Sequence, residues 1–295
     1  MTRTVLVLGA NGRFGRHVAE AFWNAGWTVR LFDRASDRLD EAAQGVDVIA
    51  NAWNPPYTDW ADQLPGLTAQ VIAAARASGA TLLLPGNVYV YGPKAPDCLT
   101  ADTPHRATNP LGRLRIEMEA AYRASGVPTI LLRGGDFLDN APSGNWFDKV
   151  IAKSMPRGVL TAPGDPDVPH AWAYLPDMAR AAVALCDKRA ELPRFADIPF
   201  PGHTLSLTEM AALVPAEGPV RVQRMSWTPL YLTSPFWKMA RHLIEMGYLW
   251  SKPHRLDEKP LTALLPDFRP TDPREVLHQA TAHLRAPATA QALRA

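Results

Sequence analysis

The sequence is poor in cysteine, in net charge and in long apolar runs. Cys98 and Cys186 are the two cysteines among 295 residues, so we expect passive thiols, a reducing compartment, no disulfide framework and no metal site. The 31 Lys and Arg residues balance 29 Asp and Glu residues without basic blocks, which argues against a nucleic-acid partner. No segment approaches the ~20 apolar residues that cross a bilayer. We therefore expect no membrane partner, although a helix lying in the membrane interface stays open.

The amino-terminal segment also lacks the features of a secretory signal. A strand-like run begins within a few residues of Met1, which leaves no room for charged, apolar and cleavage regions in series. A cytoplasmic location is therefore expected. An apolar content of 47% with 20% charged residues is typical of an ordinary globular chain.

The most informative segment that is present is a glycine-rich turn. The apolar run 5–8 has the pattern of a buried strand, and an amphipathic helix that stops near Gly26 follows the turn. Glycines at three-residue intervals permit a tight strand-to-helix turn and the close approach of a pyrophosphate to the backbone. A merely tight turn is the alternative. The residues predicted to contact a dinucleotide here are Gly9, Asn11, Gly12, Arg13, Phe14 and Gly15.

Short β-rich runs alternate with helical patterns through the first half of the chain. This alternation predicts an α/β fold, a doubly wound Rossmann-type parallel sheet with its ligand crevice at the carboxyl ends of the strands. We predict an NAD(P)-binding domain over 1–168 and a smaller substrate-binding region over 169–295, with some segments returning to the sheet. The expected strands are 5–8, 28–32, 46–50, 81–84 and 129–132, and the expected helices include 64–78, 110–126, 207–213, 235–246 and 274–284.

Several further segments strengthen this prediction. They are Asn51-Ala52 after the third strand, Val90-Tyr91-Gly92 after the fourth, Leu132-Arg133-Gly134-Gly135 after the fifth, and the later stretch from Tyr174 to Ala181. With the glycine turn, they resemble the extended and atypical short-chain dehydrogenase/reductase superfamily, specifically its NAD-dependent epimerase/dehydratase-like branch. The resemblance covers most of the chain. It implies an NAD(P) cofactor and adds Asn51 and Ala52 to the expected cofactor contacts.

The resemblance breaks at the positions that usually perform catalysis. Family members usually carry Ser or Thr three residues before the Val-Tyr-Gly element and a Tyr-x-x-x-Lys pair on the next helix. The matching positions here are Asn87, Leu111 and Arg115. Leu111 exchanges no proton, whereas Arg115 is able to hydrogen-bond the nicotinamide ribose. The Asn87 amide is expected to donate to a substrate oxygen, with capping of the turn after the strand as an equal alternative.

Any catalytic proton has to come from another side chain. The candidates near the strand ends are Tyr89, Tyr91, Asp136, His170 and Tyr174. Tyr91, at a position that often meets substrate in the resembling family, is assigned to catalysis with Asn87 and Arg115. Each candidate also has a structural alternative: Tyr91 packing beneath the cofactor, Asp136 capping a turn, and His170 serving as a satisfied structural histidine.

The cofactor is expected to be NAD or NADP, with a preference for NAD. Asp33 ends the second strand, where a carboxylate accepts hydrogen bonds from ribose hydroxyls and repels a 2′-phosphate. Arg34 follows directly and Arg13 lies in the glycine turn, so two guanidinium groups are available to surround such a phosphate. NADP therefore stays an alternative.

Aromatic residues gather between positions 227 and 250. The helical spacing of Phe236, Ala240 and Leu243 predicts a buried face, and Arg241 and Glu245 are expected to pair at i, i+4. Core packing is the more common role for such aromatic side chains. The alternative is a lining for an amphipathic substrate.

Three residues are predicted to meet the substrate, namely Asp136, Trp146 and Tyr174. Asp136 follows the fifth strand where the chain leaves the sheet. Trp146 and Phe147 follow a glycine and an asparagine, and we expect this loop to close over the site as a lid whose aromatic rings exclude water.

The sequence thus predicts an NAD(P)-dependent oxidoreductase or epimerase of atypical type, acting on a hydroxyl or carbonyl carbon of a small, sugar-like or amphipathic substrate. The joint loss of Tyr and Lys favours the alternative, a non-catalytic NAD(P)H-binding redox sensor or regulatory protein. Isomerase or lyase chemistry with a recycled cofactor is a third alternative. A homodimer through a two-helix face stays open, because Leu67, Val71 and Met118 suit an interface and a monomer's core equally.

Overall fold

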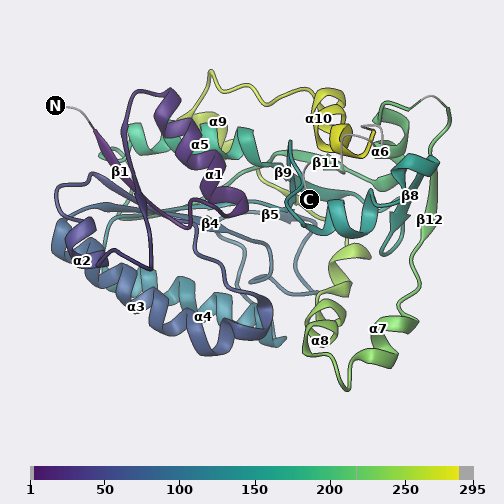
Figure 1. Cartoon of the computed structure of the whole chain (residues 1–295), viewed down its shortest axis with the longest axis horizontal. Helices are drawn as coiled ribbons and strands as arrows, with labels where there is room; N and C mark the ends of the chain where they lie inside the picture. Colours follow the sequence, from purple (N-terminus) through teal and green to yellow (C-terminus); the bar gives the residue numbers. More distant parts are fainter. Residues whose placement is uncertain (1–2, 217, 286–295) are drawn as a thin grey trace.

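The structure is a computed structural model that describes residues 3–216 and 218–285. A six-stranded parallel sheet forms the centre of one half of the molecule, on the left in Figure 1. In spatial order its strands are β10 (Phe195–Pro199), β6 (Thr129–Arg133), β4 (Thr81–Gly86), β3 (Val48–Asn51), β1 (Thr4–Leu8) and β2 (Thr28–Phe32). The predicted Rossmann-type sheet and its expected strands are confirmed. The order of the strands changes direction at β1, so the turns after β1 and β3 are neighbours at the carboxyl edge of the sheet.

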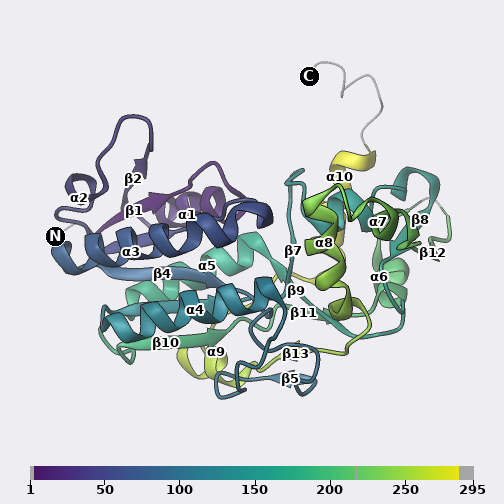
Figure 2. The same cartoon turned by 90° about the horizontal axis from the view of Figure 1, so that it is seen from below.

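Helices cover both faces of this sheet (Figures 1 and 2). One face carries α1 (Arg13–Asn24) and α5 (Leu175–Asp187), and the other carries α2 (Leu39–Ala42), α3 (Trp60–Ser78) and α4 (Pro110–Ser125). Both α3 and α4 stop at a glycine in the left-handed region, with φ values of +75° and +68°. These local stops are the reason that their carboxyl ends could be read from the sequence.

A smaller unit lies beyond the carboxyl edge of the sheet (Figure 2). It holds a three-stranded sheet in the order β11-β9-β7 and a two-stranded sheet of β12 and β8. The strands are β7 (Asp136–Leu138), β8 (Val159–Ala162), β9 (His170–Tyr174), β11 (His203–Leu205) and β12 (Arg221–Arg224). The helices are α6 (Leu207–Leu213), α7 (Thr228–Thr233), α8 (Lys238–Glu245) and α10 (Pro273–Arg285), and the short turns include η2 (Phe147–Ile151), η3 (Met155–Arg157) and η4 (Gly247–Trp250).

Residues of two of the four hydrophobic clusters, one on the sheet and one in the smaller unit, alternate along the chain on both sides of residue 168. Leu138 and Phe147 pack with Trp172 in the core of the smaller unit. Leu175 and Ala196 pack instead on the sheet, and β10 returns to pair with β6. A division into domains at residue 168 stays a prediction. The last ten residues of the predicted 169–295 region lie outside the described residues.

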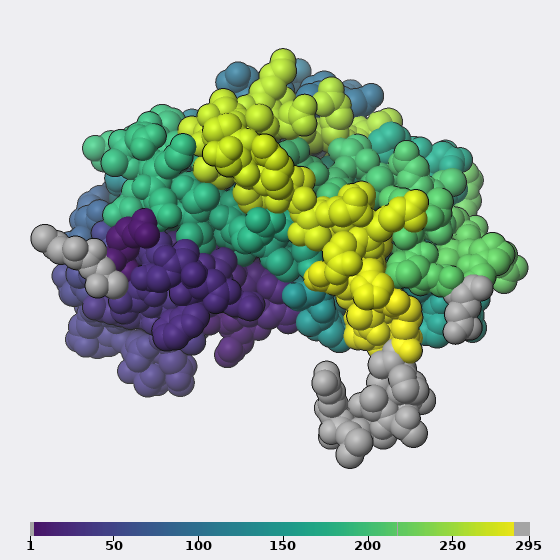
Figure 3. Space-filling view, turned by 90° about the horizontal axis from the view of Figure 1, so that it is seen from above, coloured from purple at the N-terminus to yellow at the C-terminus, as the bar shows by residue number. Residues whose placement is uncertain are grey.

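The carboxyl-terminal segment ties the two units together. Leu261 and Leu265, in and just after α9 (Lys259–Leu264), belong to the core of the sheet. Val276 and Leu277 of α10 belong to the other core. Figure 3 shows this segment, in yellow, lying across the upper surface from one unit to the other. A further link joins β5 (Cys98–Leu99) to β13 (Arg255–Leu256).

Two expectations for the aromatic segment are wrong. Phe236 is not buried but 94% exposed, because α8 begins two residues later and helical spacing does not apply to the turn before it. Arg241 does not pair with Glu245, because its guanidinium donates to the carbonyls that this turn leaves open. Glu245 pairs with His242 instead. Among the described residues, no helix is both long and apolar enough to cross a bilayer.

Candidate functional site

The glycine turn and the turn after β3 meet at the carboxyl edge of the sheet. Gly9 has a φ of +78°, and a Cβ there would lie 3.1 Å from Trp53 Cδ1 and 3.2 Å from the Ala52 carbonyl oxygen. The Gly12 N–H donates to the Gly9 carbonyl at 2.9 Å. A Cβ on Gly15 would lie 2.0 Å from the same oxygen. The turn therefore needs glycine at 9 and 15 for its own packing, whatever it binds.

The helix that follows offers its amino terminus to a ligand. No side chain caps α1, and its first turn holds no acidic residue. The N–H groups and the dipole at such an end favour an anion. Asn11 is exposed beside this end, whereas the side chain of Phe14 is buried in the core, so only its backbone is available. These residues fit the pyrophosphate of a dinucleotide.

The turn after β3 is organised by Asn51. Its Nδ2 donates to the Tyr122 hydroxyl at 3.1 Å, and its Oδ1 accepts the Trp53 N–H at 3.2 Å. The Arg34 guanidinium lies over the Trp53 ring, with its Cζ atom 4.2 Å from the ring centroid. Asp33, exposed at the end of β2, accepts the Ala35 N–H at 2.9 Å. Trp53, Arg34 and Asp33 therefore lie on the side of the glycine turn that an adenosine would occupy.

Arg13 joins the glycine turn to the smaller unit. Its guanidinium donates to the Ser143 and Gly144 carbonyls at 2.8 and 2.7 Å. One turn further along α1, His17 contacts the fully buried carboxylate of Asp139 at 2.8 Å. The loop after β7 is therefore docked on α1. Both guanidinium groups therefore already contact protein groups: Arg13 contacts two carbonyl oxygens, and Arg34 contacts the Trp53 ring.

The residues at the family's usual catalytic positions are held by the protein itself. Asn87 Oδ1 accepts the Tyr89 N–H at 3.1 Å, which is the turn-capping alternative, and leaves Nδ2 as the donor predicted for a substrate oxygen. Leu111 is fully buried. Arg115 is buried and donates to the Pro85 carbonyl at 3.0 Å. Burial lowers the pKa of Arg115.

Tyr91, the tyrosine assigned to catalysis from the sequence, is also held by the protein itself. It is 2% exposed, its hydroxyl donates to the Thr100 carbonyl at 3.2 Å, and its ring lies 5.2 Å from the Arg133 guanidinium. Burial raises its pKa. Its phenol proton is therefore already engaged by the backbone, which fits a structural role for this side chain.

A pair of tyrosine hydroxyls lies at the edge instead. Tyr89 and Tyr57, the latter in the short turn η1 (Tyr57–Asp59), share a hydrogen bond of 2.7 Å. Burial raises the pKa of both phenols, and the Asp136 carboxylate adds to both shifts. The Arg13 guanidinium opposes the shift at Tyr57. The pair is therefore within electrostatic reach of the glycine turn. Tyr57 was not predicted, although it lies just after a strand end on the same edge.

Asp136 and His170 form a second pair. The Asp136 carboxylate, 16% exposed, contacts His170 Nε2 at 2.7 Å, and the two come from the neighbouring strands β7 and β9. Trp250 stacks on the His170 ring at 4.5 Å, and His254 meets its edge at 4.3 Å. This aromatic packing fixes the imidazole against the carboxylate. Trp250 and His254 carried no signal in the sequence beyond their type.

The other predicted substrate residues are embedded in the smaller unit. Trp146 packs against Trp250 at 5.3 Å between ring centroids. Phe147 is fully buried, so the expectation that it closes as a lid is wrong for this side chain, because η2 turns it into the core. Tyr174 is buried and its hydroxyl donates to Gln279 of α10.

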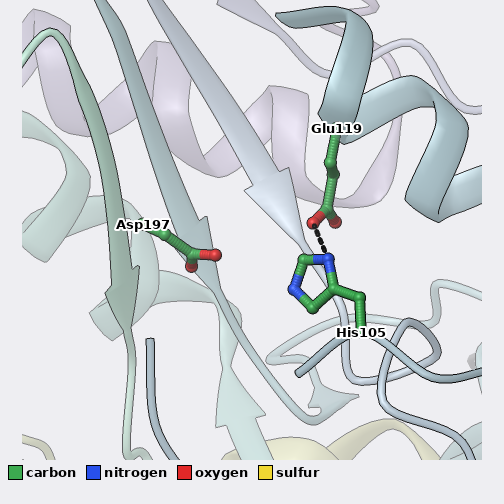
Figure 4. A group of neighbouring side chains, drawn as sticks. All are labelled: His105, Glu119 and Asp197. Atoms are coloured by element: carbon green, nitrogen blue, oxygen red, sulfur yellow. Dashed lines mark ion pairs between the residues drawn. The ribbon is translucent and has the colours of Figure 1, made fainter. Parts of the chain in front are cut away.

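One group of side chains has the composition of a metal site. Ligand atoms of His105, Glu119 and Asp197 lie within 4.8 Å of one another, and Figure 4 shows the His105 ring beside the Glu119 carboxylate. The Arg133 guanidinium, however, donates to Glu119 at 2.8 Å and to Asp197 at 2.6 Å. This guanidinium already supplies the cation that the buried carboxylates need. The cluster is an ion-pair network that joins α4, β6 and β10.

Comparisons with known proteins place this geometry in a family. A model of the NAD dependent epimerase/dehydratase family matches residues 5–198, more than half of the chain. The solved structures that resemble it include a UDP-glucuronic acid 4-epimerase from Bacillus cereus in complex with UDP-glucuronic acid and NAD, at 15% identity and a TM-score of 0.73, covering 96% of this chain and 99% of that one. No curated protein matches the sequence.

Two further structures show the same likeness. A GalE-like L-threonine dehydrogenase from Cupriavidus necator has 17% identity and a TM-score of 0.72 over 97% of this chain and 100% of its own. An NAD-dependent NDP-hexosamine 5,6-dehydratase involved in tunicamycin biosynthesis has 16% identity and a TM-score of 0.72 over 96% and 99%. At these identities the structures support the fold.

Proposed function

Because this chain belongs to the NAD-dependent epimerase/dehydratase family, we propose that it is an NAD-dependent oxidoreductase or epimerase. Its substrate is a small molecule with a hydroxyl or carbonyl carbon, and a sugar nucleotide is the first class to test, since two of the similar structures are named for UDP- or NDP-sugars. The observation that carries the proposal is the convergence of Tyr57, Tyr89, Asp136 and His170 at the sheet edge that also holds the uncapped start of α1.

The glycine turn and the start of α1 would hold the pyrophosphate, and Asp33 would accept hydrogen bonds from the adenosine ribose. NAD is favoured over NADP because Arg13 is engaged by two carbonyls and Arg34 by the Trp53 ring. A 2′-phosphate would have to break these contacts and approach the Asp33 carboxylate. Bound NAD supplies a hydride acceptor, and NADH a hydride donor, for the substrate carbon.

The protein's own side chains handle the proton. Both tyrosines keep their protons at neutral pH because burial raises their pKa values. One hydroxyl of the pair donates to the other, so a single phenol O–H is left to donate to the substrate oxygen. The hydroxyl proton that leaves during oxidation passes to the Asp136 carboxylate, which His170 holds in place. The Asn87 Nδ2 group is a second donor to the same oxygen. This set replaces the Tyr and Lys that Leu111 and Arg115 do not supply.

The same positions support a second candidate function, a non-catalytic protein that senses the NAD(H) ratio. Leu111 fills the tyrosine's position with a fully buried side chain, and Arg115 is anchored to the Pro85 carbonyl. Neither is able to exchange a proton with a substrate. The Arg13 and Asp139 contacts between the glycine turn and the smaller unit would then couple cofactor binding to the position of that unit.

Calorimetric titration of the cofactor-stripped protein with NAD, NADH, NADP and NADPH tests the proposal first. We expect the NAD pair to bind and the NADP pair to bind at least about tenfold more weakly. A panel of UDP-sugars is then assayed for NADH formation and, with bound NAD, for epimerised product. Failure of all four dinucleotides to bind would remove the proposal. Binding without turnover on the panel would favour the sensor.

A further inference from the structure

The end of α7 and the turn that leads to α8 expose four large apolar side chains. Phe236 is 94% exposed, Leu232 72%, Tyr231 59% and Trp237 49%. We call residues 231–237 the aromatic tip. It lies at the lower edge of the molecule in Figure 1, where it projects from the smaller unit. Folding alone does not account for such a cluster, because water-exposed aromatic and aliphatic groups gathered at one place mark an interaction surface.

The tip has a defined shape. The N–H groups of Phe236 and Trp237 both donate to the Thr233 carbonyl, at 3.0 and 2.9 Å. Arg241, from the first turn of α8, donates to the Ser234 and Pro235 carbonyls at 2.7 and 2.8 Å. These hydrogen bonds fix the backbone conformation of the turn. The apolar side chains of the tip are therefore exposed in a defined arrangement.

The charged side chains of residues 221–244, the segment that carries the tip, have one sign. Residues 221–244 contain no Asp or Glu, whereas Arg221, Arg224, Lys238 and Arg241 are exposed. Arg224 has a carboxylate neighbour, Asp165, at 3.8 Å. The whole chain has a formal net charge of only +2, so the positive charge is a local property of this segment. The partner therefore presents negative charge beside apolar material.

A bilayer that contains anionic lipids has both properties. Trp, Tyr and Phe side chains favour the level of the lipid headgroups, and nearby Lys and Arg side chains are attracted to anionic headgroups. A second copy of the chain is disfavoured as the occupant, because two tips facing each other would bring like charges together. We propose that the aromatic tip docks this protein reversibly on an anionic membrane surface. This revises the expectation of no membrane partner and takes up the interfacial alternative.

The proposal also places the candidate site near that surface. α8 packs against η1, which carries Tyr57, and Met246 just after α8 accepts a hydrogen bond from Asn109 at the start of α4. The next turn, η4, carries Trp250, which stacks on His170. Docking at the tip therefore brings one edge of the molecule towards the membrane surface. The same edge holds the Tyr57–Tyr89 and Asp136–His170 pairs.

Vesicle sedimentation of the full chain tests the proposal. Binding to vesicles of phosphatidylcholine with phosphatidylglycerol is compared with binding to phosphatidylcholine alone, at about 0.1 M and about 0.5 M salt. We expect binding to the anionic vesicles at least about tenfold stronger than to the neutral ones, and weakened by salt. Phe236→Ser with Leu232→Ser should lower it by about tenfold or more. Lys238→Glu should also weaken it.

Trp23→Ser is the matched control, because Trp23 is 70% exposed on α1. It should leave vesicle binding unchanged. Circular dichroism melts check that the variants fold, which we expect because each altered side chain is exposed. No binding to anionic vesicles, or equal binding by the double variant, overturns the proposal. So does a change of oligomeric state in the double variant without a change in vesicle binding, which would assign the tip to a second copy.

Discussion

At the scale of single residues, the difference between Tyr89 and Tyr91 decides the proposed chemistry. The two side chains are two positions apart in an irregular turn, yet one hydroxyl meets Tyr57 and the other meets the Thr100 carbonyl. Tyr89→Phe should lower turnover on an accepted substrate by about 10²-fold or more, whereas Tyr91→Phe should change it by less than about threefold. Steady-state kinetics of both variants check this. The reverse order would restore the role assigned from the sequence to Tyr91.

His254 provides a prediction about pH. Burial, reinforced by the charge of His170, lowers its pKa to about 3, whereas the unfolded chain takes up this proton near ~6.5. Its contribution to the free energy of unfolding is therefore fully present above ~6.5 and falls with pH below that value, by up to about 1.4 kcal/mol per pH unit. Asp136 and Lys252 also act on this group.

His254→Phe keeps a ring against His170 and removes the titration. Denaturant unfolding of wild type and variant between about pH 5 and 7 should show a shallower decline for the variant on the acid side. The exposed His278 offers His278→Gln as the control, with the slope of the wild type. Parallel curves for His254→Phe and wild type would refute the assignment.

At the scale of elements, two glycines at the start of α1 have different roles: Gly15 is needed for packing, and Gly12 is proposed to contact the cofactor. A Cβ on Gly15 would lie 2.0 Å from the Gly9 oxygen, whereas one on Gly12 would lie 3.1 Å from it. Gly15→Ala should therefore destabilise the fold by about 2 kcal/mol or more. Gly12→Val should leave the melting temperature within a few degrees and lower NAD affinity by about tenfold or more, because its side chain meets the pyrophosphate. Calorimetry and thermal melts distinguish the two, and unchanged affinity in Gly12→Val would contradict the assigned crevice.

At the scale of the whole molecule, α3 and α4 leave a groove of about 560 Å³ on the outer face of the sheet unit. Ile72, Met118 and exposed alanines such as Ala73 line it, whereas Val71 is fully buried in the core. A homodimer through a two-helix face, which the sequence leaves open, would use this groove. Ala73→Glu should then raise the fraction of monomer in light scattering, and Ala61→Glu, on α3 outside the groove, should not. A wild-type monomer would remove the prediction.

The sequence by itself determined the elements and the class of fold. Glycine stops at Gly79 and Gly126, buried runs such as β1, and the turn at Gly9 are local signals, because backbone sterics and periodicity act within a few residues. The family resemblance followed from the same motifs and is confirmed. The prediction that Leu111 and Arg115 replace the usual Tyr and Lys came from a count along one helix, and it stays a prediction.

Only the tertiary structure decided which side chains meet. Tyr57 reaches Tyr89 across separate elements, Asp136 reaches His170 across two strands, and Arg133 occupies the centre of a group with metal-ligand composition. Phe147 is buried, against the expectation of a lid, because it lies in a helical turn that packs into the core. Phe236 is exposed, against the expectation from helical spacing, because it lies in the turn before α8. Such contacts join residues far apart in the chain, so no local pattern encodes them.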